Sequence, residues 1–182
     1  MSKYLKIMIT ALLLSLVAES PLPAQPPDDG ETPGTAPIAL VEEAYLAHRK
    51  GDYDEAIKAY SRIIQRRGLT RRERAISYLL RGEAKRDSKK LDESILDFTR
   101  ALRQWPNYPQ AHYFRGRVYE QQGKMVEAYA DIARAAQLEP SRDSYQTALA
   151  LLKKRMAEAG LKVQNEARPP EPTAPELPSE DR

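Results

Sequence analysis

Apolar positions divide the chain into a short continuous run near its start and a long central part in which they recur periodically. Residues 7–18 form a run of twelve residues without a charge. In the central part, Ala128, Ile132 and Ala135 follow one another at four and three residues, which places them on one face of a helix. Residues 141–159 are also amphipathic and end before Gly160, which predicts one further helix. The pattern therefore predicts helices that pack through one face.

Residues of the same type recur 34 positions apart in this central part. The pairs are Gly82 and Gly116, Pro106 and Pro140, Arg81 and Arg115, Asp97 and Asp131, and Ala101 and Ala135. A fixed period of this kind indicates one structural unit that is used more than once. Stacked units form an extended surface, which favours binding over catalysis.

The unit from Pro109 to Pro140 resembles a tetratricopeptide repeat, a helix–turn–helix of about 34 residues. The resemblance depends on the small residue Gly116, the turn residue Gly123 and the small residue Ala128 of the second helix. Over all units together, the resemblance covers about 125 residues. It implies an all-α fold: a right-handed helix–turn–helix (TPR-like) solenoid over residues 38–163, with about three repeats and a C-terminal capping helix.

The two earlier units depart from the pattern at their connections. The unit 75–108 has Lys89 where the turn glycine belongs, so we expect a looser turn there. The first unit matches well over residues 51–56, but Gly68 stands where its closing proline belongs. Residues 66–74 then lengthen the connection to the second unit.

Several polar residues are spaced for specific contacts in such a hairpin. Three pairs predict helix N-caps, the last of them the weakest: Asp52 with Glu55, Thr70 with Glu73, and Asn107 with Gln110. Two further pairs have the same separation along the chain, and an antiparallel hairpin would bring their members side by side: Arg81 with Asp97, and Arg115 with Asp131. We therefore expect both ion pairs.

Both ends of the chain differ from this central domain. Lys3 and Lys6 precede the apolar run, and six of the 14 prolines follow it within residues 21–37, which is the layout of a secretory signal peptide. We expect a signal over 1–24, cleaved after Ala24 or alternatively Ala18, then a proline-rich linker over 25–37 and a proline-rich acidic tail over 164–182. The other possibility is an uncleaved signal anchor. The first interpretation predicts a bacterial protein, periplasmic or secreted, with no transmembrane anchor after signal removal.

The sequence offers little for catalysis or metal binding. There is no cysteine, and the two histidines, His48 and His112, are too far apart for metal-ligand spacing. No glycine-rich phosphate loop or nucleophile motif occurs. We expect a non-enzymatic protein without cofactor or metal, in which His112 is a packed residue.

The resemblance implies that the first helix of each repeat lines a concave groove for a protein or peptide partner. The candidate groove residues share one helix face within each unit: Tyr45, His48, Glu83, Arg86, Tyr113, Arg117 and Glu120. Tyrosine and arginine often dominate contact energy. Domains of this family that grip a C-terminal carboxylate carry Lys, Arg and Asn at positions held here by residues such as Val41, Leu80 and Phe114, so that mode is not expected. The acidic tail is a candidate to occupy the groove in cis.

A basic run offers an alternative site. Its members are Arg62, Arg66, Arg67, Arg71, Arg72 and Arg74. Residues 40–162 carry 25 basic and 17 acidic side chains, whereas residues 163–182 carry 2 and 5. The run suits an anionic envelope polymer or membrane surface. No nucleic acid is expected, because export removes that ligand and no aromatic residues interleave the arginines. A self-associating structural protein is the remaining alternative.

Overall fold

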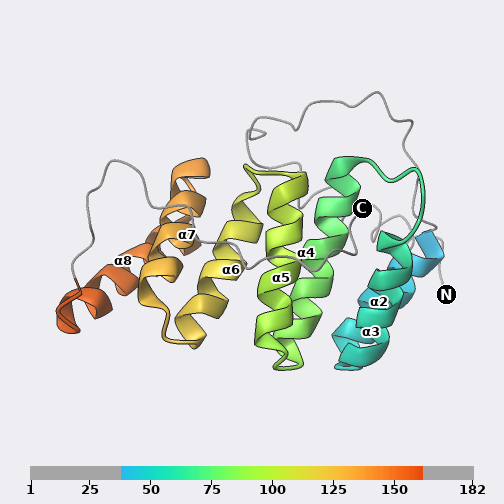
Figure 1. Cartoon of the computed structure of the whole chain (residues 1–182), viewed down its shortest axis with the longest axis horizontal. Helices are drawn as coiled ribbons and strands as arrows, with labels where there is room; N and C mark the ends of the chain where they lie inside the picture. The colour runs from blue at the N-terminus through green and yellow to red at the C-terminus, as the bar shows by residue number, and fades with distance from the viewer. Residues whose placement is uncertain (1–37, 162–182) are drawn as a thin grey trace.

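The computed structural model describes residues 38–161, which form a row of antiparallel helices with no strand among them. Figure 1 shows the helices following one another in chain order along the long axis. Their bounds are α2 Ile38–Lys50, α3 Tyr53–Ile64, α4 Arg71–Asp87, α5 Leu91–Gln104, α6 Pro109–Gln121, α7 Met125–Leu138 and α8 Asp143–Glu158. The all-helical, TPR-like solenoid expected from the sequence is confirmed. The predicted signal, linker and tail lie outside the described residues.

Each repeat is a hairpin of two helices held in close contact at a small residue. The hairpins are α2 with α3, α4 with α5, and α6 with α7, and α8 packs on α7. A methyl group added at Gly82 would lie 2.7 Å from Phe98 Cε1, and one at Gly116 would lie 2.8 Å from Ile132 Cγ1. The period in glycine therefore reflects the closest approach of the two helices in each hairpin.

The turn at Lys89 has the geometry of the turns that contain glycine. Gly51, Lys89 and Gly123 adopt φ values of +85°, +66° and +74°. In each case the next amide donates to a carbonyl five residues earlier: Lys90 N to Lys85 O is 2.8 Å, and Lys124 N to Tyr119 O is 2.9 Å. The expectation of a looser turn in the second repeat is therefore wrong. Lys89 instead adopts the left-handed conformation that lysine disfavours.

Of the three predicted N-caps, the structure contains one. At α4, Thr70 Oγ1 accepts from Glu73 N at 3.2 Å, and Glu73 Oε2 accepts from Thr70 N at 2.9 Å. Asp52 precedes α3 but makes no cap bond, because its ψ of 63° lies outside the extended region typical of a capping residue. Asn107 is displaced from the cap by Tyr108, and its Oδ1 accepts from Arg134 Nη2 at 2.8 Å. These two cap predictions are wrong.

The lengthened connection before α4 is packed onto the domain. Leu69 of this connection is buried, and Gly68 has a φ of +81° that allows the chain to turn. Arg74 Nη1 donates to the Ile64 carbonyl at 2.9 Å, which ties the start of α4 to the end of α3. The extra residues therefore do not separate the first repeat from the second.

Candidate functional site

Both predicted ion pairs are present, and each connects three helices. Arg81 on α4 donates to Asp97 on α5 from Nε at 2.8 Å and from Nη2 at 2.7 Å. Its third nitrogen, Nη1, donates to Ser61 Oγ on α3 at 3.0 Å. Lys85 Nζ also lies 2.9 Å from Asp97 Oδ2. Burial raises the pKa of Asp97, but Arg81 and Lys85 outweigh it, so this pKa lies below its usual range.

The second ion pair repeats this arrangement one unit later. Arg115 donates to Asp131 from Nε at 2.7 Å and from Nη2 at 2.9 Å, and its Nη1 donates to Thr99 Oγ1 on α5 at 3.0 Å. His112 is half-buried and hydrogen-bonds to Asp131 and to the Pro106 carbonyl, so it is a packed residue as expected. Arg115 and Asp131 are 4% and 0% exposed. We assign both pairs to architecture, because neither carboxylate faces solvent.

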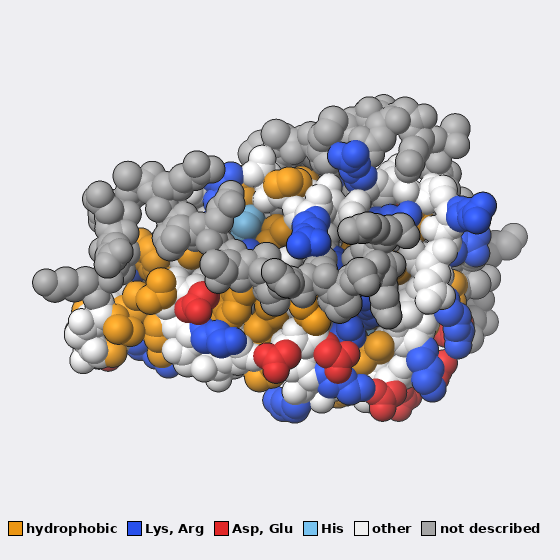
Figure 2. All heavy atoms as spheres, in the orientation of Figure 1, with side chains coloured by type: hydrophobic (Ala, Val, Ile, Leu, Met, Phe, Trp, Pro, Cys, Tyr) orange, Lys and Arg blue, Asp and Glu red, His pale blue; other side chains and the backbone are white. Residues whose placement is uncertain are grey.

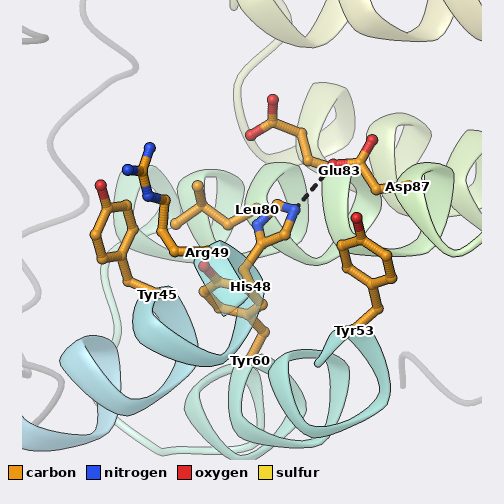
Figure 3. Close-up of a pocket in the computed structure, with 8 residues that line it drawn as sticks. All are labelled: Tyr45, His48, Arg49, Tyr53, Tyr60, Leu80, Glu83 and Asp87. Atoms are coloured by element: carbon orange, nitrogen blue, oxygen red, sulfur yellow. Dashed lines mark hydrogen bonds and ion pairs between the residues drawn. The ribbon is translucent and has the colours of Figure 1, made fainter. Parts of the chain in front are cut away.

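Three of the seven predicted groove residues meet at one cavity of about 400 Å³ between α2, α3 and α4. These are Tyr45, His48 and Glu83. The cavity is also lined by five residues outside that predicted set: Arg49, Tyr53, Tyr60, Leu80 and Asp87. Figure 3 shows the three tyrosines coming from α2 and α3, and the two carboxylates coming from α4. The cavity therefore places aromatic rings opposite acidic groups.

The two carboxylates of the cavity have different surroundings. His48 Nε2 donates to Asp87 Oδ2 at 3.0 Å, and Arg86 Nε donates to Asp87 Oδ1 at 3.0 Å. Burial raises the pKa of Asp87, but these two bonds hold it below its usual range. For Glu83 burial prevails: it raises the pKa of this carboxyl, and the attraction of Arg86 and His48 does not cancel it. Asp87 is thus engaged within the chain, whereas Glu83 faces the cavity.

The ring of Tyr60 lines this cavity, whereas its hydroxyl is enclosed by the protein. Its side chain is 1% exposed, and its hydroxyl is buried without a hydrogen-bond partner. Burial raises its pKa well above the usual range, so the hydroxyl stays protonated at neutral pH. A buried hydroxyl without a partner is costly in a folded protein and therefore merits a functional explanation.

The remaining predicted groove residues lie farther along the row. The Arg86 guanidinium lies 5.1 Å from the centre of the Phe114 ring. Tyr113 packs against Tyr145 of α8, with ring centres 4.8 Å apart. Glu120 forms ion pairs with Arg155 of α8 and with Arg117, the latter at 3.4 Å. The seven residues therefore do not form one continuous site: four are held by contacts outside the cavity.

The predicted basic run is partly used inside the domain. Arg62 pairs with Glu43 at 3.1 Å, Arg74 bonds to the end of α3, and the Arg72 guanidinium lies 5.0 Å from the centre of the Trp105 ring. Four members are exposed: Arg62, Arg66, Arg67 and Arg71. Figure 2 shows basic side chains gathered at the α3 end of the molecule and apolar ones over α8. The six arginines thus differ in their surroundings, and two of them are held by contacts of the domain while partly buried.

Residues 38–161 contain neither a metal-binding cluster nor a membrane span. In that range no group of histidine, aspartate and glutamate side chains could hold a metal ion. None of the helices described there is long and apolar enough to span a bilayer.

Comparisons with known proteins agree with this architecture. Sperm-associated antigen 1 of Mus musculus is 28% identical over 141 residues, which cover 72% of this chain but only 14% of that much longer relative. The first TPR of Spaghetti (RPAP3), bound to an HSP90 peptide, superposes with a TM-score of 0.60 at 24% identity and covers 66% of this chain and 94% of that one. The second TPR domain of human RPAP3, in complex with an HSP70 peptide, gives 0.57 at 27% identity and covers 64% and 93%.

A family model assigns most of the helical region directly. The tetratricopeptide repeat model matches residues 35–69 and 79–145, more than half of the chain. The matched ranges contain most of α2 to α7, including both buried ion pairs and the cavity between the first two repeats. The chain belongs to the tetratricopeptide repeat family.

Proposed function

We propose that this protein is an exported, non-enzymatic adaptor that binds a peptide segment of a partner protein along the face formed by its first helices. The observation that carries the proposal is the cavity between α2, α3 and α4, which is lined by three tyrosines and by the Glu83 carboxyl group. Tetratricopeptide domains of RPAP3 similar to this chain bind peptides of HSP90 and HSP70. Those complexes support peptide binding as the class of function.

Export to the periplasm or the cell exterior forms part of the same proposal. Its support is the positively charged start, the twelve-residue apolar run and the proline-rich segment behind it. Intact-mass measurement of the protein isolated from the envelope fraction tests this directly. A chain that has lost its start up to Ala18 or up to Ala24 supports export, whereas a protein that retains Met1 contradicts it.

The binding surface is tested by partner capture with the full chain. Tyr45→Ala combined with Arg117→Ala removes two exposed or half-exposed side chains of the first helices. We expect this variant to lose at least about tenfold in partner recovery, since aromatic and arginine anchors carry much of the binding energy. Crosslinking before capture, followed by mass spectrometry, identifies the partner.

A matched control removes exposed charges from the second helices instead. Lys58→Ala with Arg103→Ala should keep wild-type recovery, and circular dichroism should show both double variants folded. If the folded Tyr45 and Arg117 variant retains its partners at wild-type strength, the first-helix face is not the binding surface. The exposed arginines of the run 62–74 would then be the better site, and binding to anionic liposomes would fall steeply with salt.

A further inference from the structure

The cavity between α2, α3 and α4 presents a hydrogen-bond acceptor that the domain itself does not use. No other side chain among residues 38–161 donates a hydrogen bond to the Glu83 carboxylate. The ring of Tyr60 lines the same cavity, but its hydroxyl is enclosed by the protein and has no hydrogen-bond partner among the described residues. A ligand that donates hydrogen bonds can therefore pair with the Glu83 carboxylate.

The walls of the cavity favour a positively charged donor. Tyr45, Tyr53 and Tyr60 contribute three aromatic rings, and the faces of such rings attract ammonium and guanidinium groups. Tyr53 is fixed by an edge-on contact with His48, with ring centres 5.8 Å apart. Figure 3 shows Tyr45 and Tyr53 on either side of His48, with Tyr60 below it and Glu83 above it in this view. Aromatic rings opposite a carboxylate provide both dispersion contact and charge attraction for a cation.

The cationic groups near the cavity do not cancel its preference for a positively charged ligand. Arg86 and His48 both bond to Asp87, and Arg86 also lies over Phe114, so their hydrogen bonds are directed away from Glu83. Arg49 is exposed, where water screens its charge. Of the two carboxylates that line the cavity, Glu83 is thus the one that accepts no hydrogen bond from the other lining residues. At about 400 Å³ the cavity is also large enough for a side chain of a bound peptide.

We propose that this cavity is a subsite for one basic side chain, an arginine or a lysine, of the partner peptide. Its guanidinium or ammonium group donates to Glu83 while its aliphatic stem lies against the tyrosine rings that line the cavity. The proposal rests on the peptide-binding function above and specifies the chemistry that the first two repeats select. It predicts that the partner segment carries a basic residue where it crosses α2 and α4.

Small probes test the subsite without knowledge of the partner. The full chain, labelled with ¹⁵N, is titrated with acetyl-arginine amide, acetyl-lysine amide, acetyl-norleucine amide and acetyl-glutamate amide. We expect the two basic probes to shift the amide signals of α2 and α4 around the cavity, and the neutral and acidic probes to leave them unchanged. Equal binding of the norleucine probe would show an apolar site, and binding of the glutamate probe an anion site; either result overturns the proposal.

Two conservative variants separate the Glu83 carboxylate from the aromatic wall. Glu83→Gln keeps the shape of the side chain and removes its charge, so we expect the affinity for acetyl-arginine amide to fall by about tenfold. Tyr60→Phe keeps the ring that lines the cavity and should bind the probe like the wild type, while the midpoint of urea unfolding stays the same or rises because a buried unpaired hydroxyl is lost. The matched control is Glu158→Gln, an exposed acid on α8, which should bind like the wild type.

The outcomes separate this inference from the proposed function. If Glu83→Gln binds the arginine probe with unchanged affinity, the subsite is wrong, while partner capture still reports on the groove. If the full chain captures no partner through Tyr45 and Arg117, the adaptor proposal fails, while the probe titration still reports on the cavity. A Glu83→Gln chain that loses both the arginine probe and the captured partner supports the two together.

Discussion

Removal of Asp131 should destabilise the protein more than removal of any exposed charge. Its carboxylate is 0% exposed and accepts from Arg115 Nε at 2.7 Å and Nη2 at 2.9 Å, and from His112 Nδ1 at 2.9 Å. After Asp131→Ala, the Arg115 guanidinium stays buried with Thr99 as its remaining side-chain acceptor. Breaking one partner of a buried ion pair costs about 3–5 kcal/mol. Since the free energy of unfolding of a domain is about 5–15 kcal/mol, this loss is a large fraction of the total stability.

Urea unfolding followed by far-UV circular dichroism measures this loss. We expect the midpoint to fall at an unchanged slope, because the surface exposed on unfolding stays the same. Replacing both partners, Arg115→Met with Asp131→Leu, should recover part of the loss because no charge is left buried alone. Glu158→Ala is the control: its Lys154 partner is 3.9 Å away, both side chains are exposed, and the cost should stay below about 1 kcal/mol. A cost below about 1 kcal/mol for Asp131→Ala itself would refute the structural role assigned to the pair.

Three further predictions concern the turns, the caps and acid. Lys89→Gly should stabilise the protein by about 0.5–1 kcal/mol in the same urea assay, because glycine adopts the positive φ of this turn without strain; a lower midpoint would contradict this. Thr70→Ala should cost about 1 kcal/mol by loss of the capping box, whereas Asp52→Ala, at a helix start without a cap bond, should cost clearly less. The pKa of Asp97 lies below its ordinary 3.8, so its stabilisation is present above that pH and is lost as the pH falls through the folded-state value. Asp97→Asn should therefore show a shallower loss of stability below about pH 4, and an unchanged slope would count against this reasoning.

The fold could be predicted because its contacts repeat along the sequence. The glycines at 82 and 116 mark the same close approach of two helices, and the arginine–aspartate pairs mark the same buried contact. Each repeat of a stack meets the same neighbours, so a constraint in one unit recurs in the next. Spacing alone therefore sufficed to place those side chains opposite one another.

The cavity could be predicted only in part. Tyr45, His48 and Glu83 were found from the face that they share on first helices, but Tyr60 lies on a second helix and contributes through the space between repeats. Ser61 and Thr99, which accept from the two arginines, were missed for the same reason. Ser61 precedes Arg81 by 20 residues, whereas Thr99 precedes Arg115 by 16. The two separations differ because the connection before α4 is longer than the connection before α6. The failed caps at Asp52 and Asn107 depended on backbone angles, which residue type does not fix.

The two arginines that pair with buried aspartates, Arg81 and Arg115, also determine how the stack can open. Each reaches back to the second helix of the preceding repeat, so α4 and α6 are each fastened to two neighbouring helices by polar contacts. One period after Arg115 and Thr99 the chain has Leu149 and Ala133, which can form no such contact. Helix α8 is held instead by apolar burial, as at Leu152, and by contacts such as that of Arg155 with Glu120 near the surface. Amide protons of α8 should therefore exchange with solvent before those of α4 to α7, so that the array opens from its C-terminal helix.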